Sequence, residues 1–153
     1  MEFKTQLQAP ENTQEIIITR TFDLSVDLLF KAYTEAEFFE QWMNTKVLKF
    51  DIRKHGSYHF QTSYNGNVVF AANGVIHNVI QNQNITRTFE MENTPFPPQM
   101  EYLEFASIEK ETSQLNMLIV FKSIHFRDEM LKLPFAQGLN MAHHRLQEIF
   151  TTK

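Results

Sequence analysis

The chain has 153 residues, which suits one domain large enough to bury a sizeable core. It contains no cysteine, which excludes disulfides and thiolate chemistry and fits a cytoplasmic location. The net charge of −4 is mild, so the composition does not point to nucleic acid or to an anionic membrane surface as a partner.

Residues 1–14 are polar and predict a flexible N-terminal leader rather than a signal peptide. The β-branched segment 15–23 predicts the first strand. Ser25 can cap the first of two short helices, and the second lies near residues 35–41. Further strands are predicted by alternating apolar residues at positions 47–53, 57–63, 68–80, 85–92, 99–109 and 114–123. No apolar run approaches the roughly 20 residues that a membrane span requires.

Three features of the segment 65–98 predict a turn, a bend and a loop. Asn65-Gly66 predicts a two-residue hairpin turn, in which both residues need a positive φ. Gly74, inside the long strand at 68–80, predicts a bulge or bend. Residues 94–98 read TPFPP and predict a loop, because proline cannot donate a hydrogen bond to a neighbouring strand.

The segment from residue 127 to residue 150 predicts one long amphipathic helix, because its apolar residues recur at steps of three and four. Pro134 must lie in the first turn of this helix or mark a kink. Gly138 is expected to let the helix backbone approach whatever lies beneath it. Strands and a single long helix predict an α+β fold over residues 15–153, in which the helix lies on one curved antiparallel sheet.

The predicted elements carry a recurring set of residues, which are Arg20, Thr21, Phe22, Leu29, Phe30, Ala32, Tyr33, Thr34, Phe39, Trp42, Asp51, Arg53, Gly56, Tyr58, Phe60, Gly74, Val75, Gly138, Leu139 and Leu146. These residues resemble the SRPBCC superfamily, which is START-like and Bet v 1-like. In particular they resemble the branch of the activator of heat-shock protein 90 ATPase homologues. Within that branch's pattern, Met43 stands where a second tryptophan is common and Arg87 where an aromatic residue is usual.

The resemblance implies a helix-grip fold with a cavity between the sheet and the C-terminal helix, suited to an apolar or aromatic small molecule. It implies no particular reaction, because the superfamily includes binding proteins, cochaperone domains, cyclases and oxygenase domains. For each candidate ligand-binding residue the alternative is a place in an ordinary packed core. These candidates are Trp42, Phe50, Tyr58, Phe60, Phe70, Arg87, Phe89, Phe105, Met117, Phe135 and Leu139.

Arg87 is the candidate that most needs an explanation, because it shares a predicted apolar face with Ile85 and Phe89. A buried guanidinium requires a partner. One reading is an arginine that holds a ligand carboxylate or phosphate inside the cavity. The reading that we favour is an internal ion pair with Glu101 or Glu104 on the next strand, or an arginine that reaches water.

No catalytic residue, metal site or cofactor is predicted. The six histidines lack metal-ligand spacing and are interpreted as solvated or structural. We expect non-enzymatic binding of a small hydrophobic molecule, and a homodimer stays open. A cyclase or hydrolase would need a polar pair in the cavity, such as His77 with Glu104 or Tyr58 with Arg87. A cochaperone-like interaction module would instead fill the cavity with side chains and expose an apolar patch.

Overall fold

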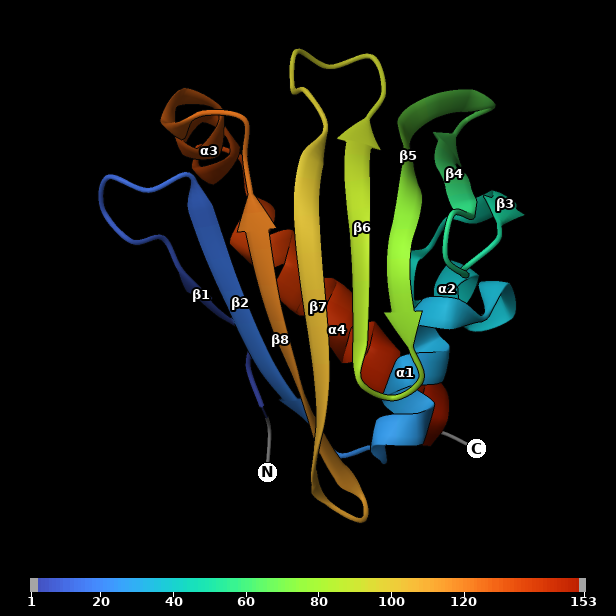
Figure 1. Cartoon of the computed structure of the whole chain (residues 1–153). Coiled ribbons are helices and arrows are strands. Elements are labelled where there is room, and N and C mark those ends of the chain that lie inside the picture. The colour runs from blue at the N-terminus through green and yellow to red at the C-terminus, as the bar shows by residue number, and fades with distance from the viewer. Residues whose placement is uncertain (1–2, 152–153) are drawn as a thin grey trace.

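One antiparallel sheet of eight strands curves over a long helix in the computed structural model, which describes residues 3–151 (Figure 1). The strand order is β1-β2-β8-β7-β6-β5-β4-β3. Within residues 3–151 no helix is long and apolar enough to cross a membrane. The elements are β1 (Gln6–Gln8), β2 (Glu15–Phe22), α1 (Val26–Thr34), α2 (Ala36–Met43), β3 (Lys46–Phe50), β4 (Ser57–Tyr64), β5 (Asn67–Ile80), β6 (Asn84–Met91), β7 (Gln99–Glu109), β8 (Thr112–Val120), α3 (Ile124–Leu131) and α4 (Phe135–Thr151).

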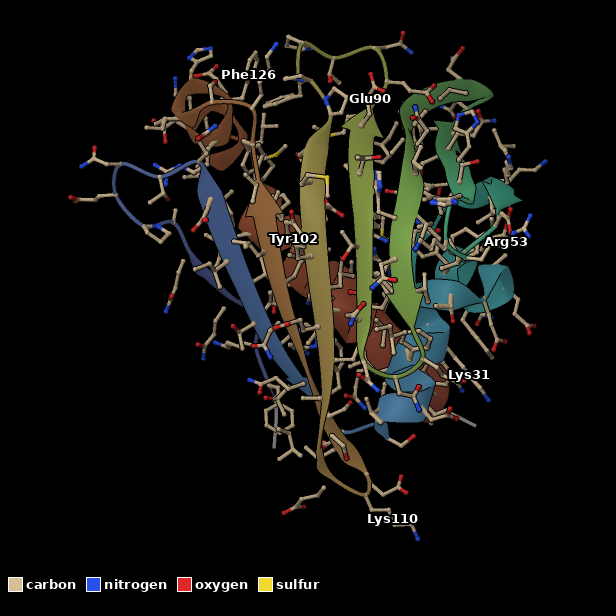
Figure 2. All side chains as sticks on the ribbon, in the orientation of Figure 1. Lys31, Arg53, Glu90, Tyr102, Lys110 and Phe126 are labelled. Carbon is tan, nitrogen blue, oxygen red and sulfur yellow. The ribbon has the colours of Figure 1, made fainter. Side chains whose placement is uncertain are left out.

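The inner face of the sheet is set by strict alternation in β2 and β8, where every second residue is buried. Ile16 lies opposite Ile119, and Ile18 lies opposite Met117, so the apolar faces of the two strands coincide. Burial of each such side chain stabilises the folded state by about 1.5–3 kcal/mol relative to leaving it exposed. In Figure 1, α4 runs behind β8, β7 and β6, against this inner face. Figure 2 looks onto the outer face, where Tyr102 of β7 is labelled and is 41% exposed.

The β4–β5 hairpin has the predicted two-residue turn, with φ values of 52° at Asn65 and 81° at Gly66. Gly74 of β5 is required by a close approach between strands. A Cβ atom at this position would lie 2.0 Å from the backbone oxygen of Thr88 and 2.5 Å from the hydroxyl of Tyr58. The register shift in β5 lies slightly further along, between Ile76 and Asn78.

The single helix predicted over residues 127–150 is wrong in one respect, because the chain forms two helices. The first, α3, ends at Leu131, and α4 begins at Phe135, directly after Pro134. Proline cannot continue a helix from the preceding turns, since it lacks an N–H group and clashes with the carbonyl four residues earlier. Gly138 makes no close approach, as no atom lies within 4 Å of the position that its Cβ would take.

Part of the predicted N-terminal leader, residues 1–14, forms regular structure. Gln6–Gln8 pair with β2 as an edge strand, with Leu7 opposite Ile18. The backbone N–H of Thr5 also donates to Oδ1 of Asn140 in α4, at 2.9 Å. These bonds connect the segment to both layers of the fold. Residues 1 and 2 of the predicted leader lie outside the described residues.

Candidate functional site

A cavity of about 460 Å³ lies between the inner face of the sheet and the first half of α4. The helix residues Phe135, Leu139 and Ala142 form its roof. On the other side of the same helix segment, Ala136 and Met141 are exposed. The first half of α4 therefore lies between the cavity and the solvent. The volume lies within the range of about 300–1,000 Å³ that is usual for sites of small molecules.

All but two of the predicted ligand-binding residues line this cavity. Phe50 lies outside, because its ring packs against Phe39 with the ring centroids 5.0 Å apart. Phe105 also lies outside, because it packs in the core against Phe30 and Tyr33 at 5.2 and 5.6 Å. The predicted residues that the structure brings together around the cavity are Trp42, Tyr58, Phe60, Phe70, Arg87, Phe89, Met117, Phe135 and Leu139.

The polar part of the cavity wall is a buried ion pair between adjacent strands. Arg87 of β6 lies opposite Glu101 of β7, and its Nε donates to Oε1 of Glu101 at 2.8 Å. Nε2 of Gln99 donates to the other oxygen of the same carboxylate, at 2.9 Å. The exposed fractions of Arg87 and Glu101 are only 9% and 3%. The predicted internal ion pair is confirmed, with Glu101 rather than the exposed Glu104 as its partner.

Two tyrosines complete this wall. The guanidinium carbon of Arg87 lies 5.5 Å from the ring centroid of Tyr58, at a distance typical of a cation–π contact. The hydroxyl of Tyr58 donates to the backbone oxygen of Thr88 at 2.6 Å. Burial raises the pKa of both Tyr58 and Tyr33 above the ordinary value, so both hydroxyls stay protonated. Tyr58 and Arg87 are therefore in contact, but the hydroxyl proton of Tyr58 is already donated to the backbone oxygen of Thr88.

The other pair that an enzyme would need, His77 with Glu104, is not brought together at the cavity. His77 and Glu104 are both exposed, and neither lines the cavity. Residues of β7 alternate between the two faces of the sheet, so Glu104 points outward next to the buried Leu103 and Phe105. His77 lies at the register shift of β5, next to the buried Ile76. A reaction in the cavity therefore cannot use these two side chains.

A second polar cluster lies behind the cavity and holds α4 to the N-terminal segment. His143 is 1% exposed, with its Nδ1 2.6 Å from Oγ1 of Thr5 and its Nε2 3.4 Å from the hydroxyl of Tyr33. Arg20 donates to Oγ1 of Thr5 at 3.2 Å and to Oδ1 of Asn140 at 3.0 Å. Burial, followed by the charge of Arg20, lowers the pKa of His143 to about 3. This histidine is therefore neutral and structural.

A family profile described as "Activator of Hsp90 ATPase homolog 1-like protein" matches residues 23–151. The chain belongs to this family. Its α+β architecture, with a long C-terminal helix under a curved antiparallel sheet, is the helix-grip fold that the sequence resemblance implied. Comparison with curated protein sequences gave no match.

Solved structures share this fold at low sequence identity. Protein Ms6760 of Mycobacterium smegmatis has a TM-score of 0.86 and 17% identity, with 98% of each chain covered. A Rhodobacter sphaeroides protein has a TM-score of 0.86 and 15% identity, covering 98% of this chain and 100% of that one. CalU16 of Micromonospora echinospora has a TM-score of 0.63 and 18% identity, covering 99% and 90%. At these identities the likeness establishes the fold alone.

Several cavity residues of this family member were not among the predicted ones. The alternation in β7 could have identified two of them, because Gln99 and Glu101 point to the same face of the strand as the apolar Leu103. The spacing in α2 could have identified another, since Phe39 lies three residues before Trp42. The roles of the remaining residues depend on how far α4 stands from the sheet, which no local pattern encodes. They are Ile18, Tyr33, Met43, Met91, Ile119, Met130, Pro134, Gly138, Ala142 and Arg145.

Proposed function

We propose that this protein binds a small hydrophobic or aromatic molecule in the cavity between the sheet and α4, without catalysing a reaction on it. The observation that carries the proposal is the cavity itself, whose lining is mostly apolar and whose charged side chains are the Arg87–Glu101 ion pair and Arg145. Sites for small molecules combine a mostly apolar lining with a few placed polar groups. The family's fold is consistent with a scaffold for hydrophobic ligands.

The size of the cavity supports binding over ordinary core packing. Protein interiors are close-packed, and voids much larger than a water molecule are few. A cavity of 460 Å³ is many times larger than the space that a single water molecule needs. Water in this space makes fewer hydrogen bonds than bulk water, because the mostly apolar lining offers few partners. An apolar ligand removes that cost and adds contacts with the aromatic lining.

The cochaperone-like alternative fits the cavity less well, because it requires an interior filled by side chains. An exposed apolar group does exist at the β4–β5 hairpin, where Tyr64, Val68 and Val69 are 70%, 51% and 62% exposed. It lies on different residues from the cavity lining. An enzyme would need an acid–base pair in the cavity, and the buried groups there are already engaged in the Glu101 ion pair and the Tyr58–Thr88 bond.

Thermal unfolding against a panel of aromatic acids, aromatic ketones, fatty acids, sterols and flavonoids tests this proposal. A ligand that binds only the native state raises the free energy of unfolding by about 2.7 kcal/mol at a hundred times its Kd. Ala142→Phe places a ring in the roof of the cavity, and we expect it to abolish the shift. Ala136→Phe puts the same ring on the exposed side of α4 and is the matched control.

The expected result is a shift with one chemical class that survives in Ala136→Phe and disappears in Ala142→Phe. A shift that survives equally in both variants would place the ligand outside the cavity. No shift across the panel would remove the support for a binding function and favour a protein partner, with the β4–β5 hairpin as the first surface to examine.

A further inference from the structure

We infer that the cavity selects a neutral ligand that carries a hydrogen-bond acceptor, such as a ketone, ester or amide carbonyl, and discriminates against a carboxylate. This inference rests on the proposed binding function and specifies its ligand class. Arg87 and Glu101 together make this part of the cavity wall a donor of hydrogen bonds, while their opposite charges balance each other.

The donor capacity comes from the two terminal nitrogens of Arg87. Only Nε of this side chain has a hydrogen-bond partner among residues 3–151, and that partner is Glu101. The terminal nitrogens carry four further N–H groups on a residue that is 91% buried and lines the cavity. An acceptor on the ligand can pair with these N–H groups, whereas an aliphatic group would cover them and leave them without a partner, which is costly.

The charge of Arg87 is already balanced within the wall. Glu101 supplies one negative charge at 2.8 Å, and both of its oxygens accept hydrogen bonds, from Arg87 and from Gln99. Tyr33 and Tyr58 add no charge. A ligand carboxylate at the guanidinium would therefore lie near the Glu101 carboxylate in an apolar space, and like charges in such a space repel strongly. A carbonyl oxygen accepts the same donors without that repulsion.

Arg145 is the other cation in the lining, and it does not change this balance at the inner wall. It belongs to α4 and is half-buried, and its Nε donates to the backbone oxygen of Trp42 at 2.9 Å. A half-exposed guanidinium is hydrated and screened by water. Its attraction for an anion is correspondingly weaker than that of a buried, unbalanced charge.

Three ligands of nearly equal shape test the inference by isothermal titration calorimetry. Each is a biphenyl with a two-carbon arm, which ends in a methyl ketone, a carboxylate or an isopropyl group. We expect the wild-type protein to bind the ketone at least about tenfold more tightly than either of the others, as a hydrogen bond to a charged donor allows.

The variant Glu101→Gln removes the balancing charge while keeping the shape of the side chain. The amide of Gln99 can rotate to present its oxygen to the new amide. We expect affinity for the carboxylate to rise at least about tenfold in this variant, while affinity for the ketone changes by less than about threefold. Glu104→Gln is the matched control, because it removes the same charge from the outer face of β7 and leaves the ligand order unchanged.

Tightest binding of the carboxylate by the wild-type protein would overturn the inference, as would equal binding of the ketone and the isopropyl compound. Either result would leave the proposed binding function standing, because a ligand would still occupy the cavity. Binding of none of the three would count against the proposed function and the inference together. The wild-type comparison decides the matter even if Glu101→Gln fails to fold.

Discussion

Among single residues, Gly74 shows how the absence of one side-chain atom allows a contact in the cavity wall. Gly74 allows the Tyr58 hydroxyl to reach the backbone oxygen of Thr88, because a Cβ at Gly74 would occupy the same space. Tyr58 in turn lies against the guanidinium of Arg87. The glycine thus determines where the polar end of the cavity lies, although it carries no functional group.

We expect Gly74→Ala to lower the free energy of unfolding by about 3 kcal/mol, because overpacking forces either Tyr58 or β6 to move. Urea denaturation measures the loss. The Tyr58 hydroxyl should also lose its partner, so tyrosine absorbance in the near ultraviolet should change in the native state. A variant as stable as the wild type would show that the contact between β5 and β6 is looser than described.

His143 predicts a specific dependence of stability on pH. Its pKa is about 3 in the native protein, below the ordinary value of 6.5, so the unfolded chain takes up the proton first as the pH falls. The stability that this residue contributes is complete above about pH 6.5 and is lost as the pH falls towards 3, by up to about 1.4 kcal/mol per pH unit.

Replacement of His143 by Gln should remove this part of the acid sensitivity. Urea denaturation at pH 7, where the contribution is complete, and at pH 5.5 and 4.5, where it is being lost, should show a smaller loss of stability for the variant than for the wild type. His125→Gln changes a histidine of α3 instead and serves as the control. Parallel curves for the wild type and His143→Gln would contradict the assignment of a buried neutral imidazole.

At the scale of elements, α4 does two things: its second half packs in the core, and its first half covers the cavity. Leu146 is fully buried, whereas Gly138 has open space around it. The break at Pro134 separates this helix from α3, whose Phe126 is labelled at the upper end of the molecule in Figure 2. The cover of the cavity therefore consists of the helix segment with the least support beneath it.

We expect Gly138→Ala to raise the free energy of unfolding by about 0.5–1 kcal/mol, since alanine favours a helix and its methyl group meets no atom. The same substitution at Gly74 should act in the opposite direction, so the two variants form a matched pair. Thermal unfolding measures both. A destabilised Gly138→Ala would mean that α4 lies closer to the sheet in solution than the structure shows.

Elements with a strong local pattern were predictable, and those that depend on long-range packing were not. Alternation identified the inner face of β6 and therefore the burial of Arg87, and the Asn65-Gly66 turn fixed the β4–β5 hairpin. The strand β1 was missed, because three residues with one apolar side chain carry no period. The helix break was missed because the apolar spacing continues across Pro134, while the backbone cannot.

The cavity residues were likewise predictable where a local pattern identifies them, and not where helix placement decides. Aromatic residues on inward strand positions, such as Phe60 and Phe89, could be named from alternation together with the family resemblance. Phe50 and Phe105 share that pattern and yet pack against α2 and α1, because those helices cover their end of the sheet. Which inward side chains face a cavity and which face a helix is decided by the placement of helices, and that information is not local.

For the molecule as a whole, we propose that the space under α4 takes an apolar ligand. Trp42 is the only tryptophan of the chain, is 2% exposed and lines the cavity. Its fluorescence therefore reports on the occupancy of the cavity without a label. The rest of the molecule, from the ion pair of β6 and β7 to the roof of α4, is arranged around the space that this side chain borders.

The most direct test is a titration of the protein with the biphenyl ketone while the emission of Trp42 is recorded. We expect a saturable change at one ligand per chain, which persists in Ala136→Phe and is lost in Ala142→Phe. Emission that does not change, or a change that is linear and unsaturable and is the same in both variants, would contradict the claim that the cavity is a binding site.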